Sequence, residues 1–224
     1  MSNDKGTLFA RYLPFWNKLS ADEKEFLYRN TAEKKYRKGD IIHSGDDQCT
    51  GVLLVKKGQL RIYMLSDDGR EITLYRLYPG ETCTLSASCM LNEIKFDVFI
   101  DVQEESEIEV VNIAAIEKLS NENVFVENYI YKQTVSRFSD VMWAMQQILF
   151  MSFDKRLANF IIKELLKSEG STIKLTHEQI AKYMGSAREV VTRMLKYFSD
   201  EGIVELTRGA IQVKDIKKLK KIVE

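Results

Sequence analysis

The stretch GSAREVVTRML, residues 185–195, places an arginine directly beside a glutamate in a run that is otherwise half aliphatic. At 100° per residue, the polar side chains from Arg188 to Lys196 fall within an arc of about 140°, and the apolar side chains occupy the opposite side. The stretch therefore predicts a helix with one apolar face that packs on a core and one polar face that meets solvent or a ligand.

The residues on either side extend this helix into a winged helix-turn-helix. LTHEQIAKYM, residues 175–184, predicts a shorter first helix with Thr176 as its N-cap. A small residue, a turn glycine and two aliphatic residues stand at the spacings of a helix-turn-helix: Ala181, Gly185, Val191 and Met194. Residues 202–213 then predict two strands joined through Arg208-Gly209, which form a wing beside the second helix.

The polar face of the second helix carries the chemistry that reads DNA in the major groove. Arginine matches the O6 and N7 acceptors of guanine with two hydrogen bonds, and a carboxylate accepts a hydrogen bond from N4 of cytosine. Side chains around this face are placed to contact phosphates, which position a protein on DNA without reading bases: Thr176, Lys182, Ser186, Lys196 and Arg208. Two alternatives stay open. Glu189 and Arg193 also form an ordinary exposed i,i+4 pair, worth about 0.3–0.5 kcal/mol, and a signalling module could use the same helices to bind protein.

Charge is divided unevenly along the chain. The 224 residues include 33 Lys and Arg and 33 Asp and Glu, so the formal net charge is zero. Residues 153–224 hold 15 of the basic and 10 of the acidic residues, so this part carries five excess positive charges and the rest an equal negative excess. The asymmetry favours contact between the C-terminal part and a polyanion.

Composition predicts a cytoplasmic protein with no membrane partner. The 45% of apolar and 29% of charged residues are ordinary for a folded domain. No apolar run is long enough to span a bilayer, and the N-terminus lacks the positive start and apolar segment of an export signal. Three cysteines, at positions 49, 83 and 89, do not make a disulfide framework and suit a reducing compartment.

Residues 40 to about 113 show the pattern of short antiparallel strands. In QLRIYML, residues 59–65, apolar side chains alternate with Arg61 and Tyr63, which is typical of a half-buried strand. Lys57-Gly58 and Asp68-Gly69 predict tight hairpins, because glycine adopts the positive φ that such turns need. The pattern resumes after a break with Val98, Ile100 and Val102 on one side. Strands at this spacing predict an antiparallel sandwich or barrel.

Residues 121–151 contain no glycine or proline and predict one long helix. Apolar side chains step along it by four and three residues, as in a coiled coil: Tyr131, Val135, Phe138, Met142, Met145 and Leu149. At 1.5 Å per residue the helix is about 45 Å long, more than a small domain needs. We therefore predict a homodimer through this stripe. The alternative is a core helix packed against its own β domain, and Val141 and Ile148 widen the stripe enough for one side to contact the sheet.

The predicted fold is α+β, with three parts: a β-roll (jelly-roll-like) sensor over residues 1–120, a dimerisation helix over 121–152 and a winged helix-turn-helix over 153–224. Phe153-Asp154 interrupts the long helix, with Asp154 as the expected N-cap of the next helix and Gly170 as its C-terminal glycine.

With these features the sequence resembles the CRP/FNR family of bacterial transcription regulators over nearly its whole length. The most specific match is SAREVVTR, residues 186–193, where the family carries Arg-Glu followed by a second Arg. The resemblance implies four base-reading side chains in each half of a two-fold symmetric operator: Arg188, Glu189, Thr192 and Arg193. Since Arg188 and Glu189 are both present, it implies a TGTGA-like half-site rather than a TTGAT-like one. RNA polymerase is the further partner it implies.

The sensor departs from the family members that bind cyclic AMP. Those members carry a cassette that begins with Gly-Glu and ends in an arginine that grips the cyclic phosphate. Gly80-Glu81 match, but residues 93–98 read EIKFDV, and no arginine occurs between Arg76 and Arg137. Asp97 would repel a phosphate. The sequence therefore argues against cyclic AMP and leaves the effector unidentified, with an expected pocket around the cassette: Gly80, Glu81, Thr82, Leu85, Ser86, Cys89 and Phe96.

Other cofactors and an enzymatic role fit the residue inventory poorly. An iron–sulfur cluster needs clustered cysteines, and residues 1–48 contain none. His43 is the sole histidine available to hold haem or a cupin-type metal, which needs two or three. A thiol switch of Cys83 and Cys89 stays open. We expect no catalytic residues, no metal and no enzyme activity.

Overall fold

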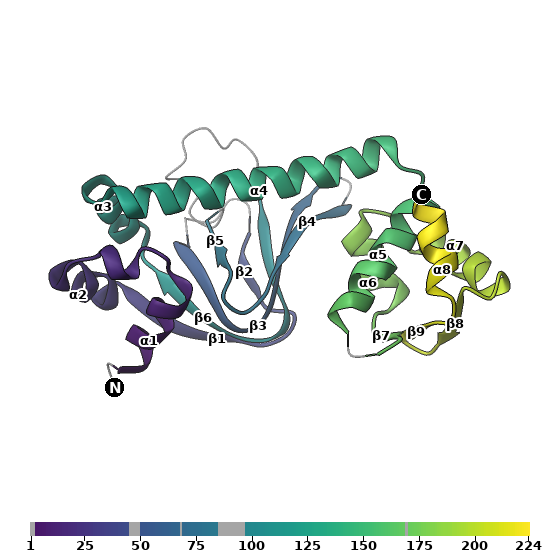
Figure 1. The fold of residues 1–224 in the computed structure, drawn as a ribbon, viewed down its shortest axis with the longest axis horizontal. Coiled ribbons are helices and arrows are strands. Elements are labelled where there is room, and N and C mark those ends of the chain that lie inside the picture. Colours follow the sequence, from purple (N-terminus) through teal and green to yellow (C-terminus); the bar gives the residue numbers. More distant parts are fainter. Residues whose placement is uncertain (1–2, 45–49, 68, 85–96, 169) are drawn as a thin grey trace. The chain divides into compact units, whose positions relative to one another are not determined.

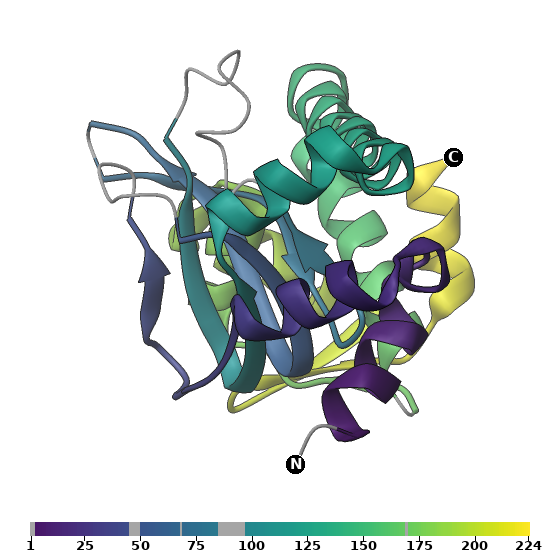
Figure 2. The ribbon, with the colours of Figure 1, turned by 90° about the vertical axis from the view of Figure 1, so that its left-hand side faces the viewer.

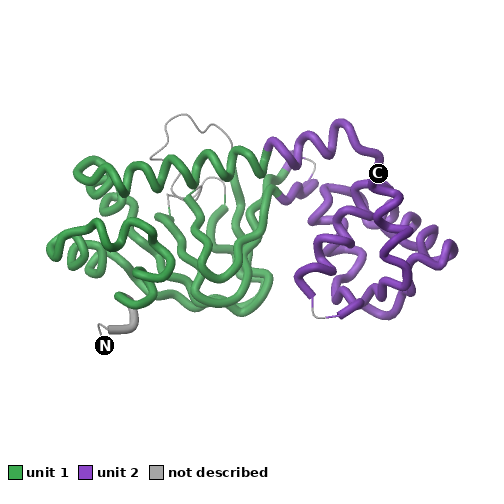
Figure 3. The backbone as a smooth tube through the Cα atoms, in the orientation of Figure 1, with its two compact units in different colours: residues 1–65, 74–141 green, residues 66–73, 142–224 purple. Residues whose placement is uncertain are grey.

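The computed structural model describes residues 3–44, 50–67, 69–84, 97–168 and 170–224. The chain divides into two compact units (Figure 3). The first comprises residues 1–65 and 74–141, and the second comprises residues 66–73 and 142–224. None of the helices in the described ranges is both long and apolar enough to cross a lipid bilayer.

The first unit contains an antiparallel β-roll that is preceded by short helices and followed by two more (Figure 1). The helices before the roll are α1 (Asn3–Tyr12), the 3-10 helix η1 (Trp16–Lys18) and α2 (Ala21–Arg29). The strands are β1 (Thr31–Tyr36), β2 (Ile41–His43), β3 (Val52–Leu65), β4 (Glu71–Leu77), β5 (Thr82–Cys83) and β6 (Phe99–Val111). They pair in the order β1-β6-β3-β4, with β2 on β6 and β5 on β3. The predicted antiparallel β-roll is confirmed.

The hairpin predicted at Lys57-Gly58 is wrong. Strand β3 runs without interruption from Val52 to Leu65 and merges two predicted strands. Its register against β6 shifts on both sides of Lys57, and Gly58 has φ of +88°. The positive φ therefore serves a β-bulge that bends a long strand rather than a turn. The second predicted turn is present, because Gly69 donates its N–H to the Ser66 carbonyl, although Asp68 lies outside the described residues.

Between Leu60 and Tyr63, both faces of β3 are buried, which the half-buried prediction did not anticipate. Leu60 and Ile62 are fully buried as expected, but Arg61 is only 2% exposed and Tyr63 only 7%. Inside the roll, Arg61 Nε donates to both carboxylate oxygens of Asp101 at 3.1 Å. The Tyr63 ring stacks on Phe99 with centroids 5.4 Å apart. The polar side chains of the alternating pattern thus have partners on β6 instead of solvent.

The N-terminal helices, drawn in purple, pack around an aromatic cluster at one end of this unit (Figures 1 and 2). Ser20 forms a capping box with Glu23 at the start of α2. The rings of Phe9, Trp16 and Tyr28 contact one another, with centroids between 5.3 and 5.7 Å apart. Helix α3 (Ile113–Glu122) adds Ile116 and Leu119 to this core.

Helix α4 (Val124–Phe150) is the predicted long helix, and it begins three residues later than expected. Asn123 separates it from α3 and donates its amide to Glu23 at 2.9 Å. One side of α4 is covered, since Val126 and Ile130 are buried in the aromatic core and Val141 packs partly against the interior of the roll. The predicted stripe on the other side is between 44% and 67% exposed: Tyr131, Val135, Phe138, Met142, Met145 and Leu149.

The second unit contains a helical core and a small three-stranded sheet. Its elements are α5 (Phe153–Lys167), β7 (Thr172–Ile173), α6 (His177–Met184), α7 (Arg188–Asp200), β8 (Val204–Thr207), β9 (Ala210–Val213) and α8 (Ile216–Val223). The wing hairpin at Arg208-Gly209 is confirmed, and β7 adds a third strand in the order β7-β9-β8. Strand β7 has only two residues, which is too short for a period of two to reveal it. The division at residues 120 and 152 remains a prediction.

Both predicted ends of the helix α5 differ from the structure. Its N-cap is Ser152, not Asp154, which lies in the first turn. The Ser152 hydroxyl donates to the Asp154 carboxylate, and this hydrogen bond lowers the pKa of Asp154. The helix ends at Lys167 with Ser168 as C-cap, so Gly170, with φ of +105°, stands beyond the cap.

Candidate nucleic-acid interface

Helices α6 and α7 meet at a tight turn that the local sequence specifies. Thr176 and Gln179 form a capping box, in which the Thr176 hydroxyl accepts from the Gln179 N–H at 3.2 Å. At the other end of α6, Gly185 adopts the left-handed conformation with φ of 57° and ψ of 46°. The Ser186 N–H then donates to the Ala181 carbonyl at 3.0 Å. This pattern ends α6 and redirects the chain into α7.

The apolar side of α7 is locked into the core of the second unit. Val191, Leu195 and Phe198 are fully buried, and Met194 packs against the same cluster. Complete burial of three large side chains on one helix fixes its rotation about its own axis. The polar side of α7 therefore has a defined orientation.

That polar side is exposed, and its charged groups are not engaged by other described side chains. The four predicted base-reading side chains are all classed as exposed: Arg188, Glu189, Thr192 and Arg193. Within the described ranges, no hydrogen bond or salt bridge joins Glu189 to Arg193 or occupies Arg188. The surface ion pair considered as an alternative is thus not formed, and the charged groups remain available to a ligand.

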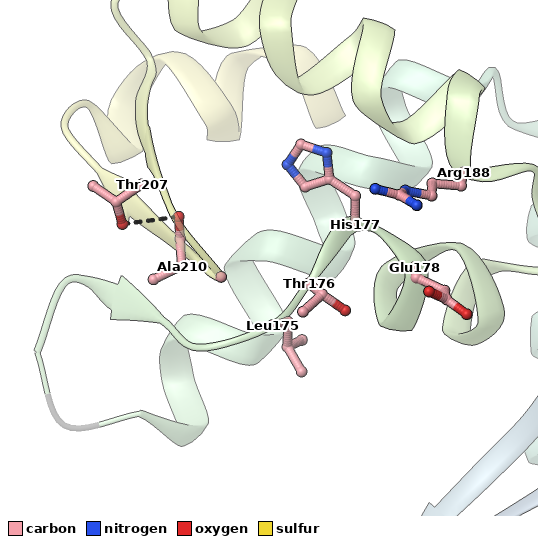
Figure 4. A pocket seen from close by; sticks show the side chains of 8 residues that line it. Leu175, Thr176, His177, Glu178, Arg188, Thr207 and Ala210 are labelled. Carbon is pink, nitrogen blue, oxygen red and sulfur yellow. Dashed lines mark hydrogen bonds between the residues drawn. The ribbon is translucent and has the colours of Figure 1, made fainter.

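A cleft of about 340 Å³ lies beside this face (Figure 4). It is lined by residues from the start of α6, the start of α7 and the wing: Leu175, Thr176, His177, Glu178, Arg188, Thr207, Gly209 and Ala210. The Nδ1 atom of His177 lies 3.0 Å from Oγ1 of Thr192. Burial and the positive charge of Arg188 lower the pKa of His177. Sequence reasoning missed this contact, because the two side chains belong to different helices.

The five predicted phosphate contacts have different surroundings. Lys196 and Arg208 are exposed, and Lys182 and Ser186 are half-buried. The Thr176 hydroxyl donates to Gln179 Oε1 at 3.0 Å in addition to accepting the capping hydrogen bond. Its hydroxyl is thus already used within α6, and its role toward phosphate, like that of the others, remains a prediction.

In the first unit, the described part of the predicted effector pocket lines a cavity of about 390 Å³. Gly80, Glu81 and Thr82 contribute to it together with Arg137 of α4. Gly80 has φ of +93°, and a Cβ there would lie 2.6 Å from the Tyr12 ring, so only glycine fits. The remaining predicted members lie outside the described residues: Leu85, Ser86, Cys89 and Phe96.

Two side chains tie this cavity to α4. The hydroxyls of Thr82 and Tyr129 are 2.8 Å apart. Arg137 is 9% exposed, donates to Asp140 at 3.0 Å and lies over the Tyr75 ring at 4.8 Å. No helical pattern in the sequence singled out Arg137, because a charged residue on an amphipathic helix is expected to face solvent.

The described candidates for redox or metal chemistry, Cys83 and His43, are buried among neighbouring side chains. Cys83 is fully buried, with its sulfur 3.9 Å from the Tyr75 hydroxyl, whereas Cys89 lies outside the described residues. His43 is buried, and its Nδ1 lies 3.2 Å from Thr50 Oγ1. Across the described ranges no group of three or more His, Cys, Asp or Glu is placed to hold a metal ion.

A winged helix-turn-helix with an exposed charged helix, on a chain that also carries a β-roll and a long helix, is the arrangement of a DNA-binding transcription regulator. Two family models match it, the Crp-like helix-turn-helix domain over residues 155–222 and the cyclic nucleotide-binding domain over residues 33–123. The chain belongs to the CRP/FNR family of transcription regulators. Members of this family are regulators, so the metal-dioxygenase alternative is excluded and the protein is not an enzyme.

Similar proteins cover most of the chain. The crystal structure of a CRP/FNR-family transcriptional regulator from Eubacterium rectale is 44% identical, with a TM-score of 0.90, over 95% of this chain and 98% of that one. The cyclic AMP receptor protein of Thermus thermophilus is 24% identical over 213 residues, which are 93% of this chain and 96% of that protein. The anaerobic regulatory protein of Bacillus subtilis is 22% identical over 195 residues, 84% of this chain and 82% of that protein.

Proposed function

We propose that the protein is a cytoplasmic homodimer that binds a two-fold symmetric operator and is controlled by a small molecule or a redox signal acting in the β-roll. The observation that carries the proposal is the two-sidedness of α7. Val191, Leu195 and Phe198 are fully buried, while Arg188, Glu189 and Arg193 are exposed and have no partner among the described residues. Three exposed charged groups on a rigidly held helix have the donors and the acceptor that match base edges in the major groove.

Each of these side chains has a definite task in the proposed complex. Arg188 and Arg193 supply paired donors for guanine O6 and N7, and the Glu189 carboxylate accepts from cytosine N4. Thr192, one turn along the same face, contacts a further base. The exposed Lys196 and Arg208 neutralise phosphates and set the register of the protein on the duplex.

The exposed stripe of α4 supports the homodimer. Six large apolar side chains at coiled-coil spacing remain between 44% and 67% exposed, although the opposite side of the helix is buried in the first unit. A second copy of the same helix would cover this stripe by knobs-into-holes packing. A dimer of this kind presents two α7 helices to successive major grooves, about 34 Å apart.

The cavity around Gly80, Glu81 and Thr82 supports control by an effector. Its wall includes Arg137 and Tyr129 of α4, so a molecule bound there contacts both the sheet and the helix that carries the dimer stripe. Such a molecule shifts the population toward the arrangement it binds more tightly, by no more than its difference in affinity between the two states. The operator-bound dimer then acts on RNA polymerase.

The test is a selection of binding sites from random duplex DNA, followed by affinity measurements on the selected operator. We expect an inverted repeat. Glu189→Ala should weaken binding by about 1–3 kcal/mol and relax preference at one base pair. Asp200→Ala removes the same charge from the other end of α7, about 16 Å away at 1.5 Å per residue, and should leave preference unchanged. Equal loss for Glu189→Ala on selected and random DNA would contradict the base-reading role.

Salt dependence separates DNA binding from the protein-binding alternative. Phosphate contacts release counterions, so the logarithm of the affinity should fall linearly with the logarithm of salt concentration, by about 0.9 per contact. An affinity for DNA that is insensitive to salt and to sequence would instead favour a helix-turn-helix that binds protein.

A further inference from the structure

A hydrogen bond connects the first helix of the helix-turn-helix to the reading face of the second. His177 is the first residue of α6, and its Nδ1 lies 3.0 Å from Oγ1 of Thr192 on α7. Thr192 is exposed on the same face as Arg188 and Arg193, whereas His177 is partly buried against the cleft (Figure 4). The threonine hydroxyl therefore has one hydrogen-bond partner inside the protein, and it can still form hydrogen bonds with a ligand on the exposed side.

The chemistry of imidazole makes the direction of this hydrogen bond consequential. When Nδ1 carries no proton, it accepts the hydroxyl hydrogen of Thr192, and the hydroxyl has only lone pairs left for a base. When Nδ1 is protonated, as it always is in the imidazolium ion, it donates to Oγ1 and frees the hydroxyl hydrogen. In the first case Thr192 can only accept, from adenine N6 or cytosine N4. In the second it can donate to guanine or thymine acceptors.

Burial and the nearby positive charge of Arg188 both disfavour protonation of His177 in the free protein. Arg188 at the start of α7 repels a second positive charge, and this repulsion adds to burial in lowering the pKa of the ring. Glu178 of α6 is the acidic lining residue. The wing contributes only uncharged lining residues, Thr207, Gly209 and Ala210. The ring therefore accepts a proton only below the usual range of histidine or beside an added negative charge, such as a phosphate.

We propose that His177 is a positioning residue for base recognition, which orients the Thr192 hydroxyl and, on protonation, turns it from an acceptor toward a donor to the base. This inference rests on the proposed base-reading role of Thr192. His177 acts through Thr192 and not by touching the base itself.

The experiment uses the full-length protein and four operators that differ only at the base pair whose preference changes in Thr192→Val. Fluorescence anisotropy gives relative affinities at about pH 8 and about pH 5, the second chosen well below the usual histidine pKa because the pKa of His177 is lowered. Acidification should shift preference toward bases that present acceptors by about two- to tenfold, the value of one hydrogen bond. His177→Ala should abolish this shift. His177→Asn, which can hold the hydroxyl but does not titrate, should keep a preference that is independent of pH.

The combination of both changes tests whether His177 works through Thr192. In the Thr192→Val background, His177→Ala should have no further effect on preference. Thr207→Ala removes a hydroxyl that lines the same cleft and donates to the Ala210 carbonyl at 3.3 Å, and it should keep the pH shift. Thermal melting of each variant checks that the fold is retained.

Two results would overturn this inference but leave the proposed function standing. In one, His177→Ala weakens binding to all four operators equally, as a direct phosphate contact would. In the other, it changes preference as much without the Thr192 hydroxyl as with it. If Thr192→Val left preference unchanged at every base pair, the base-reading role of Thr192 and the inference would fall together.

Discussion

Single residues in the β-roll show how a charge is accommodated inside a core. Arg61 stands directly opposite Asp101 in the register of β3 and β6, and the pair lies within the roll. Tyr63 covers the guanidinium at 4.1 Å, and Gln103 donates to the same carboxylate. A buried charge of this kind is tolerated only with its counter-ion and hydrogen bonds in place.

Removal of Asp101 should therefore be strongly destabilising. Asp101→Ala leaves the guanidinium of Arg61 buried without its carboxylate, and we expect the free energy of unfolding to fall by about 3–5 kcal/mol. Urea denaturation monitored by circular dichroism measures the change. Glu107→Ala is the matched control, since Glu107 lies on the same strand and pairs with the exposed Lys35 at 3.3 Å. Its cost should stay below about 1 kcal/mol, and similar costs for both variants would contradict the argument.

At the scale of an element, the bend of β3 depends on Gly58. Its φ of +88° is one that side chains rarely adopt, and a Cβ there would lie 2.5 Å from the Glu105 carbonyl oxygen and 2.8 Å from the Ser106 Cα. Ser106 is fully buried, and its Oγ accepts from the Gln59 N–H at 3.2 Å. The bulge is thus packed against β6 by backbone atoms that cannot move aside.

A comparison of Gly58→Ala with Gly69→Ala should separate the cost of steric overlap from the cost of backbone strain. Gly69 also has positive φ, +78°, but a Cβ there would meet nothing within 4 Å. Gly69→Ala should cost about 1 kcal/mol from strain alone, whereas Gly58→Ala should exceed it by about 1–3 kcal/mol because of the overlap. Thermal and urea unfolding of the two variants give the comparison. Equal losses would show that β6 yields to the added methyl group.

On the scale of the whole molecule, α4 carries two opposite surfaces. One is buried in the core of the first unit through Val126 and Ile130, and the other exposes the apolar stripe. The seam was readable from the sequence, but the same spacing also fits a helix buried in its own domain. In the described residues the stripe is exposed, up to 67% at Val135.

A charge in the stripe should separate the proposed dimer. Val135→Glu places a carboxylate at the centre of a seam where it would face its own copy, so we expect sedimentation velocity to report the mass of a single chain. Affinity for the inverted repeat should fall with it. Lys132→Glu is a larger change of charge at an exposed position about a quarter turn from the stripe, and it should leave the mass of the dimer unchanged. A dimer that survives Val135→Glu would contradict this interface.

Local features were predictable because they depend on neighbours in the chain. The capping box at Thr176, the left-handed Gly185 and the two faces of α7 all arise from residues within one or two turns. The turn at Gly58 was mispredicted for a related reason. A glycine with positive φ suits a hairpin and a bulge equally, and only the pairing of β3 along β6 distinguishes them.

The amino-acid sequence by itself determined the class of fold, the order of its parts and the face of α7 that is left for a ligand, because periodicity records which side of an element is apolar. Only the tertiary structure decided which partners the polar side chains of these elements meet. Arg61 meets Asp101 forty residues away, Arg137 turns inward over Tyr75, and His177 reaches Thr192 across the helix-turn-helix. Each of these contacts joins residues of two different elements. The periodicity within either element gives no sign of the other, so only the folded chain shows which residues meet.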